Sequence, residues 1–311
     1  MFDLLIRNAQ VLDGTGAPAY LADVAGKDGK IAAVGKIAGE AAETVDAAGL
    51  TLAPGFIDVH GHSDFFMPLD PARASKLLQG VTTELCGQCG LGPAPVTEQN
   101  YSLYHKYLSQ QGIPMYPDDR TFTSFSAYLS RMEQTPAGIN LAYFIPHGTV
   151  RLAVMGFSHD APDDRQLAQM RELVEDAMQA GALGLSTGLA YAPGRFAATD
   201  ELAALTEPVG RYGGVYTSHL RDQGDQLEQS VQEAIDIARR GGARVNVSHH
   251  KAVGEQNFGK VRKTTQMLHE AGIPATHDVY PYAASSTMLI STLPMAFAQL
   301  EPQALLQALA D

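Results

Sequence analysis

The pattern of apolar and polar positions changes near residue 53 and divides the chain into two predicted domains. Before this point the sequence has short strand-like stretches, such as the one around Leu4 and Ile6, and the dipeptides Asp13-Gly14 and Asp28-Gly29 are typical of hairpin turns. After it, apolar runs alternate with helical periods, which is typical of parallel strands joined by crossover helices. We predict a small β-domain at residues 1–53 and a larger α/β domain at residues 54–311.

The larger domain contains seven apolar runs that we interpret as strands. Two intervening segments, residues 163–180 and 225–240, carry apolar side chains on one helical face and end at glycines, and Pro162 precedes the first. Regular βα units predict a TIM-like (β/α)₈ barrel, whose functional groups gather at the carboxyl ends of the strands. The predicted strands are residues 55–59, 80–86, 139–146, 182–188, 214–218, 244–248 and 275–280.

Two segments depart from this regular pattern. Residues 91–121, rich in Pro, Gly and Tyr, are too long for an ordinary βα connection and predict an active-site rim or an interface insertion. Residues 302–311 predict a helix, and no eighth strand follows the seventh. We therefore expect the barrel to be incomplete at strand eight and the sequence to be a portion of a longer protein, without the carboxyl-terminal strands that complete the small β-domain as a sandwich.

Charge and composition exclude several classes of partner. The 34 acidic and 22 basic residues give a net charge of -12, whereas proteins that bind nucleic acid need clustered Lys and Arg. The sequence has neither a basic leader nor an apolar run of about 18 residues, the length that a membrane-spanning helix requires. We expect a cytoplasmic protein with no nucleic-acid or membrane partner.

Histidines follow several of the predicted strands. His60 and His62 end the first strand, and alternation along a strand directs residues i and i+2 to the same side, so both imidazoles can reach one ion. By itself this pair is equally typical of two surface histidines. His219 follows the fifth strand and His249-His250 follow the sixth, so three strands carry histidine at the same end. This distribution favours a metal site.

The two cysteines, Cys86 and Cys89, are too few for the disulfide framework of a secreted domain. A C-x-x-C pair also occurs in redox proteins, but there it opens a helix, whereas this pair closes a strand. A zinc knuckle would need a second cysteine pair, and the sequence has none. A Cys89 thiolate is a good zinc ligand, so Cys89 joins the candidate metal ligands. His147, which ends the third strand, is interpreted as a pocket-lining residue.

The chain resembles the D-aminoacylases, the N-acyl-D-amino-acid deacylases of the amidohydrolase superfamily. The resemblance covers essentially the whole sequence, and its later motifs are more specific than the first ones. The motifs are residues 5–9, 13–16, 54–62, 80–83, 87–90, 186–194, 218–222, 248–251, 257–259 and 278–282.

The resemblance implies a zinc enzyme and assigns its ligands. One tightly bound zinc would be held by Cys89, His219 and His249, and His60 and His62 would face a second, weaker metal position. His249 is preferred to the adjacent His250 because a strand end directs only one of two neighbours inward.

Other residues receive roles from the same resemblance. Lys251, Arg221 and Tyr282 would bind the substrate carboxylate, and Tyr191 the acyl-amide region. The fourth strand has no lysine, which argues against the carboxylated-lysine bridge of dihydroorotase-like and hydantoinase-like members. The family's general base, an aspartate after strand eight, would lie beyond Asp311, so no catalytic base is assigned.

The expected reaction is zinc-dependent hydrolysis of the amide bond of small-molecule N-acyl-D-amino acids, which gives a D-amino acid and a carboxylate without an organic cofactor. Two alternatives stay open. One is a cyclic-amide hydrolase (dihydroorotase-like or hydantoinase-like) or a dipeptidase of the same superfamily, and the other is a non-catalytic metal-binding protein.

Overall fold

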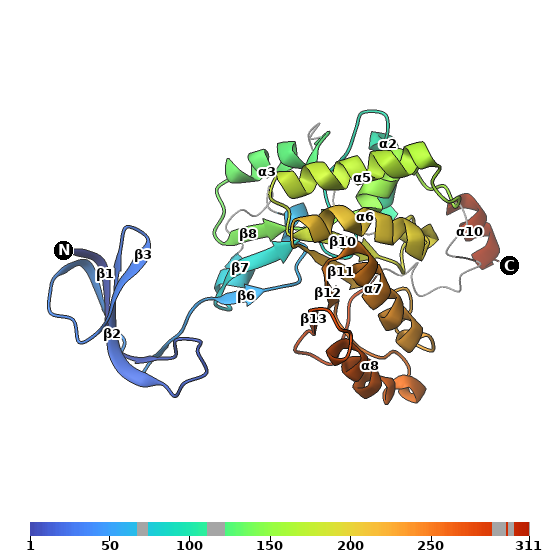
Figure 1. Cartoon of the computed structure of the whole chain (residues 1–311). Coiled ribbons are helices and arrows are strands. Elements are labelled where there is room, and N and C mark those ends of the chain that lie inside the picture. Colours follow the sequence, from blue (N-terminus) through green and yellow to red (C-terminus); the bar gives the residue numbers. More distant parts are fainter. Residues whose placement is uncertain (67–73, 111–121, 288–296, 298–301, 311) are drawn as a thin grey trace. The chain divides into compact units, whose positions relative to one another are not determined.

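The computed structural model describes residues 1–66, 74–110, 122–287, 297 and 302–310 (Figure 1). The chain consists of two compact units, Met1–Phe56 and Ile57–Asp311. Within the described ranges, no helix is both long and apolar enough to cross a membrane.

The small unit is a β-sheet. Its first two strands are antiparallel, and the second and third form a hairpin in which Lys27 pairs with Lys30, as the Asp28-Gly29 dipeptide predicts. Asp13-Gly14 also lies between two antiparallel strands, but in a loop of residues 12–19 that is longer than a tight turn and in which Asp13 accepts hydrogen bonds from Thr15. The strands are β1 (Phe2–Val11), β2 (Tyr20–Lys27), β3 (Lys30–Gly35), β4 (Ala41–Asp46) and β5 (Thr51–Leu52), in the order β3-β2-β1-β4, with β5 paired to β1.

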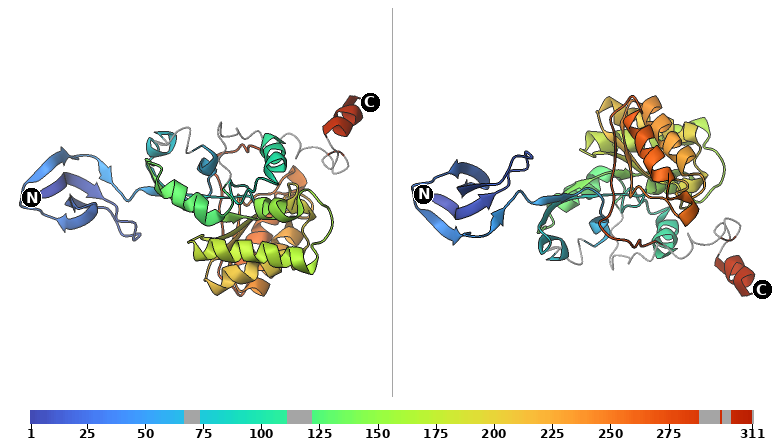
Figure 2. Two further views of the ribbon diagram at one scale, coloured as in Figure 1. Left: turned by 90° about the horizontal axis from the view of Figure 1, so that it is seen from above. Right: turned by 90° about the horizontal axis from the view of Figure 1, so that it is seen from below.

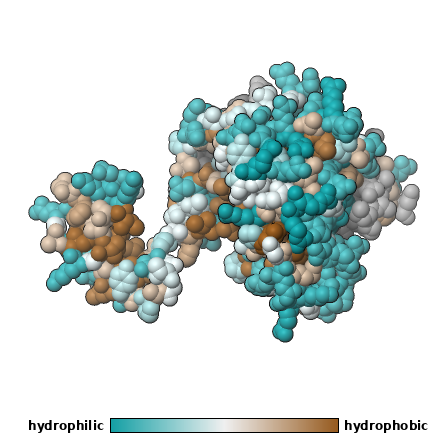
Figure 3. Space-filling view, viewed as in Figure 1, coloured by the Kyte–Doolittle hydropathy of each residue, from teal (hydrophilic) through white to brown (hydrophobic). Residues whose placement is uncertain are grey.

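The small sheet leaves part of its apolar surface uncovered. Ile31 and Val34 on β3 are exposed, and together with Leu4, Ile6 and Val24 they line an open hollow of about 510 Å³. Figure 3 shows the apolar side chains gathered on this unit. An apolar surface of this kind usually packs against another layer.

The large unit contains the parallel strands that the sequence predicts. Every ladder whose register is described there is parallel. The strands neighbour one another in chain order, in a three-stranded sheet β6-β7-β8 and a five-stranded sheet β9-β10-β11-β12-β13. Their bounds are β6 (Phe56–Asp58), β7 (Val81–Cys86), β8 (Asn140–Tyr143), β9 (Ile145–Pro146), β10 (Gly184–Gly188), β11 (Val215–His219), β12 (Arg244–Val247) and β13 (Ala275–His277).

The strand predicted at residues 139–146 is interrupted at Phe144. Tyr143 pairs with Cys86 of β7, whereas Ile145 pairs with Leu185 of β10, so the segment changes partner at this residue. The interruption depends on the two neighbouring strands, β7 and β10, and the order of apolar and polar residues along the segment does not indicate it. It divides the series of strands into two hydrogen-bonded sheets.

Helices cover one face of the five-stranded sheet. In Figures 1 and 2, α5, α6 and α7 lie side by side over it, and α8 packs against α7. Helix α5 begins at a capping box formed by Asp163 and Gln166, and α7 ends at Gly242 with a left-handed backbone. The main helices are α3 (Phe125–Glu133), α4 (His147–Met155), α5 (Asp164–Gln179), α6 (Thr199–Arg211), α7 (Leu227–Gly241) and α8 (Lys260–His269).

The described part of the long segment predicted as a rim or insertion packs against helix α4 and against residues that follow strand β7. Leu91, Val96, Tyr104 and Tyr107 form a buried cluster with Cys89, and residues 111–121 lie outside the described part. The helix predicted near residue 302 is present as α10. The remaining elements are α1 (Ala74–Leu77), α2 (Tyr101–Gln110), α10 (Pro302–Ala310) and the short 3₁₀ helices η1 (Ser63–Phe65), η2 (Gly194–Phe196) and η3 (Glu255–Asn257).

Candidate metal centre

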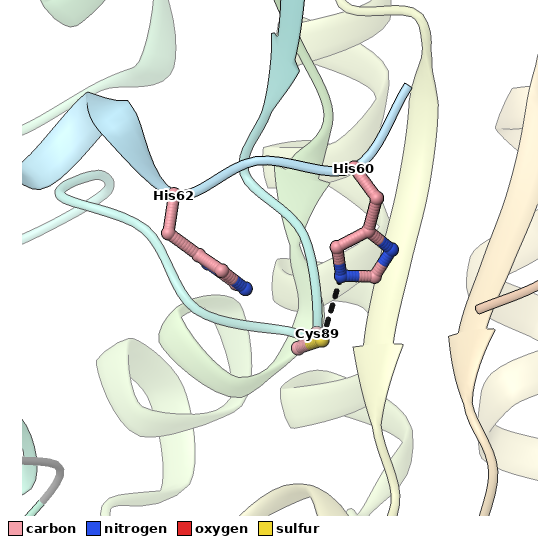
Figure 4. A group of neighbouring side chains, drawn as sticks. All are labelled: His60, His62 and Cys89. Carbon is pink, nitrogen blue, oxygen red and sulfur yellow. Dashed lines mark hydrogen bonds between the residues drawn. The ribbon is translucent and has the colours of Figure 1, made fainter. Parts of the chain in front are cut away.

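The candidate metal ligands gather where strands of the large unit end. His60 and His62 follow β6, Cys89 follows β7, His219 is the last residue of β11, and His249 follows β12. Carboxyl ends of parallel strands meet at one edge of a sheet, which brings distant parts of the sequence together. Figure 4 shows the imidazoles of His60 and His62 both directed at Cys89.

The Cys89 thiol is the shared corner of two triads. His60 Nε2 lies 3.3 Å from Cys89 Sγ, and His249 Nε2 lies 3.6 Å from it. The ligand atoms of His60, His62 and Cys89 lie within 4.8 Å of one another, and so do those of Cys89, His219 and His249. The geometry therefore brings together two adjacent groups of side chains, each able to hold a metal ion, with the Cys89 sulfur common to both.

Backbone conformation at two of these residues is unusual. Cys89 has φ of 56° and His249 has φ of 37°, a left-handed region that non-glycine residues rarely adopt. The preceding turn fits only with glycine at position 87, because a Cβ there would lie 2.2 Å from the carbonyl oxygen of Phe144. Strained backbone held by tight packing is common at functional sites.

The electrostatics of the site favour a thiolate. Burial by itself would raise the pKa of Cys89, but His60, His219 and His249 outweigh it and hold the pKa well below its ordinary value. For His60, burial again opposes the charged form, whereas the Cys89 thiolate and Asp278 raise its pKa to about 10. The Cys89 thiolate and the Asp278 carboxylate thus favour a positive charge at this position, whether a proton on His60 or a metal cation.

The donor set fits a divalent transition metal. One thiolate and four imidazoles are the ligand types that zinc and its neighbours prefer. Within the described residues, the buried Nδ1 atom of His62 has no hydrogen-bond partner, as expected if this imidazole coordinates a metal ion.

Comparison with known proteins identifies the family of this chain. The model of the amidohydrolase family matches residues 43–279, which is most of the chain. The chain belongs to the amidohydrolase family. D-aminoacylase of Alcaligenes xylosoxydans xylosoxydans is 38% identical over 93% of this chain, and the match covers 59% of that relative. This amidohydrolase chain therefore spans about three fifths of the length of the curated relative.

Solved structures of N-acyl-D-amino-acid deacylases are also similar to this chain. N-acyl-D-glutamate deacylase from Bordetella bronchiseptica, in complex with zinc and a phosphonate mimic of the tetrahedral intermediate, matches 92% of this chain and 60% of its own, with 37% identity and a TM-score of 0.86. A D-aminoacylase studied for its binuclear metal centre matches 93% of this chain and 60% of its own, with 35% identity and a TM-score of 0.84. The α/β organisation of this amidohydrolase is thus that of the D-aminoacylases.

Other side chains of this amidohydrolase contact the candidate ligands, and the sequence analysis assigned no role to two of them, Asp278 and Gln223. The Asp278 carboxylate lies 3.3 Å from His60 Nδ1 and accepts hydrogen bonds from the backbone N–H of His249 at 2.6 Å and from Asn246 Nδ2 at 2.8 Å. Gln223 Nε2 lies 3.0 Å from His249 Nδ1. Asp278 directly follows β13, which ends at His277, but the predicted strand extended to residue 280, so Asp278 did not stand out as a residue at a strand end.

Replacing Asp278 by asparagine is expected to weaken metal binding about ten- to a hundredfold, because a carboxylate that holds a metal-binding histidine increases its basicity and fixes its ring. Competition with a chelating dye measures the change in affinity. The control is Asp236→Asn, which alters an exposed carboxylate on α7 that pairs with Arg239. Equal zinc affinity in Asp278→Asn and the unaltered protein would contradict this role.

Two of the predicted substrate residues border the metal centre. Lys251 Nζ lies 3.3 Å from His249 Nδ1, and the Tyr191 hydroxyl lies 3.4 Å from His219 Nδ1. Burial lowers the pKa of Lys251, although Cys89 and Asp278 oppose this effect. Tyr282 is exposed and stacks on Tyr280, with ring centroids 5.3 Å apart.

Arg221, which the sequence predicts to bind a substrate carboxylate, is paired with a carboxylate of the chain itself. Its guanidinium donates to Glu233, at 3.0 Å from Nε and 2.9 Å from Nη2. It also donates to the backbone carbonyls of Arg195 and Ala197. These contacts occupy most of its donors, and sequence spacing could not reveal them because Glu233 lies on a different element.

Two further histidines lie apart from the metal ligands. His250 is buried and its Nε2 lies 2.8 Å from Thr264 Oγ1 of α8, so its ring faces away from the position that His249 occupies beside Cys89. His147 does not line an open pocket as predicted. It is fully buried at the start of α4, where its Nε2 lies 3.1 Å from Glu201 Oε1.

Proposed function

We propose that this chain carries the metal centre of an enzyme that hydrolyses the amide bond of N-acyl-D-amino acids and releases a D-amino acid and a carboxylate. The observation that carries the proposal is the buried Cys89 thiol, shared by two groups of imidazoles. Membership of the amidohydrolase family supports it, as does the similarity to D-aminoacylase over most of the chain.

The proposed metal is zinc, held tightly by Cys89, His219 and His249, with a second, weaker position at His60 and His62. The thiolate and imidazole donors support zinc, and so does the zinc complex of the similar deacylase. When bound, zinc would act as a Lewis acid: it would polarise a carbonyl group and lower the pKa of water toward neutrality.

The chain's own residues supply substrate contacts in this proposal. Lys251 is proposed to bind the substrate carboxylate, with Tyr282 at the outer edge of the site. Tyr191 is proposed to hydrogen-bond the acyl-amide region. The support is the position of Lys251 and Tyr191 beside His249 and His219.

The proposed complete fold is a (β/α)₈ barrel formed from residue 54 onward, with a small β-domain at residues 1–53. The parallel strands in chain order support a barrel. The open apolar hollow of the small sheet supports further strands that complete a sandwich.

A substrate panel tests the reaction. N-acetyl-D-methionine and N-acetyl-D-glutamate should be hydrolysed by the zinc-loaded full-length protein, and their L-enantiomers and hydantoin should not. Release of the free amino acid is measured by an amine-reactive reagent. Faster opening of hydantoin would favour a cyclic-amide hydrolase, and zinc binding without turnover of any amide would favour a non-catalytic protein; either result contradicts the proposal.

Replacing Lys251 by alanine is expected to raise KM about tenfold or more for N-acetyl-D-methionine, because an ammonium close to the metal centre binds the substrate carboxylate in ground and transition states alike. KM for the neutral analogue N-acetyl-D-methioninamide should change little. The control Lys263→Ala removes an exposed lysine that pairs with Glu228 on α7. An equal increase of KM for both substrates would exclude Lys251 from the carboxylate site.

A further inference from the structure

The loop at residues 189–198, between β10 and α6, carries Tyr191 and is bound by the guanidinium of an Arg221–Glu233 ion pair. Arg221 Nη1 donates to the carbonyl of Arg195 at 2.8 Å, and Nη2 donates to that of Ala197 at 2.9 Å. The same guanidinium forms two hydrogen bonds with the Glu233 carboxylate on α7. Arg221 is about one third exposed and Glu233 less, at 31% and 16% of their side chains.

A short chain of contacts leads from this ion pair to the metal centre. The backbone N–H of Arg195, whose carbonyl Arg221 binds, donates to the carbonyl of Tyr191 at 2.7 Å. The Tyr191 ring packs on His219, with centroids 4.6 Å apart, and its hydroxyl lies 3.4 Å from Nδ1 of that ring. Displacement of residues 195–197 therefore moves Tyr191 relative to His219.

Arg221 is well placed for this role because it lies two residues after His219 at the end of β11. The loop is thus attached to the same strand end that presents a metal ligand. Glu233 extends the attachment to the start of α6, since Thr199 Oγ1 donates to Glu233 Oε1 at 2.9 Å. The planar guanidinium meets a carboxylate and two carbonyls at once, which the single ammonium of lysine cannot do.

We propose that Arg221 and Glu233 are positioning residues that fix the 189–198 loop and so hold Tyr191 against His219. The ion pair acts through Tyr191 and touches neither substrate nor metal. This inference rests on the proposed function only for its catalytic consequence, because the fixing of the loop is a property of the chain itself.

The test compares Arg221→Lys, Tyr191→Phe and the double variant in the zinc-loaded full-length protein. The matched control is Arg240→Lys, which alters an exposed ion pair between Arg240 of α7 and Asp200 of α6, 2.8 Å apart. Amide hydrogen exchange of residues 189–198 reports on the loop, and metal analysis reports on zinc content. The kcat/KM value for N-acetyl-D-methionine reports on catalysis.

Arg221→Lys should accelerate exchange in the loop about tenfold or more, because breaking the contacts lowers the free energy of local opening, and Arg240→Lys should not. Zinc content should stay unchanged. Arg221→Lys and Tyr191→Phe should each lower kcat/KM about tenfold, and the double variant should be little worse than either, since both act through one contact.

Unchanged exchange in Arg221→Lys would overturn the inference, and so would a double variant whose loss is the product of the single losses. If Arg221→Lys raised KM alone and left amide hydrogen exchange of the loop unchanged, Arg221 would instead be a residue that binds the substrate carboxylate. This result would also overturn the inference. If the unaltered protein hydrolyses none of the amides, the proposed function fails, while faster exchange in Arg221→Lys would still support the fixing of the loop.

Discussion

Replacing Cys89 by serine is expected to remove the tightly bound zinc and abolish amide hydrolysis. The sulfur is common to both ligand triads and is buried, so no neighbouring group can take its place. A serine hydroxyl stays protonated near neutral pH and is a poor zinc ligand. Because the binding of a structural zinc is worth about 10–16 kcal/mol, losing one of the three ligands costs on the order of 4 kcal/mol, or roughly a thousandfold in affinity.

The matched control for Cys89→Ser is Cys86→Ala, which removes the other thiol of the chain. Cys86 lies in the hydrophobic core three residues earlier and belongs to neither ligand triad. Zinc per protein, measured by mass spectrometry after dialysis, should fall in Cys89→Ser and stay at the level of the unaltered protein in Cys86→Ala. Full zinc content in Cys89→Ser would remove Cys89 from the site and, with it, the main support for the proposed function.

Replacing Glu201 by alanine is expected to lower the free energy of unfolding by about 3–5 kcal/mol, because it leaves a buried charge without its partner. Arg151 is fully buried, and its Nε donates to Glu201 Oε1 at 3.1 Å. Burial by itself would raise the pKa of Glu201, but His147 and Arg151 outweigh it and lower the pKa, so the carboxylate is charged. Among the residues that the structure describes, the guanidinium then keeps only the carbonyls of Ser158 and Asp160 as acceptors.

The control for Glu201→Ala is Glu207→Ala on the same helix. Glu207 pairs with Arg171 of α5 at the surface, with exposed fractions of 49% and 37%, and such pairs contribute about 1 kcal/mol or less. Urea unfolding followed by circular dichroism compares the two variants. Similar losses of stability would show that the buried pair contributes no more than the exposed one.

Local patterns in the sequence determined most of the secondary structure. Helices α5 and α7 begin and end within two residues of their predicted bounds, because helical period, the Asp163 cap and the glycine at 242 act over a few residues. The interruption at Phe144 and the long loop at residues 12–19 were not predictable. Both depend on which strands lie alongside, which the local pattern does not specify.

The sequence by itself also determined which side chains gather at the strand ends, because parallel strands bring their carboxyl ends to one edge regardless of the rest of the fold. Only the tertiary structure decided how those side chains are paired. Asp278 reaches His60 across 218 residues of sequence, and Arg221 binds Glu233 on α7 instead of facing the metal centre. Partners of this kind are set by packing between elements and by side-chain direction, whereas spacing along one element fixes only the face on which a residue lies.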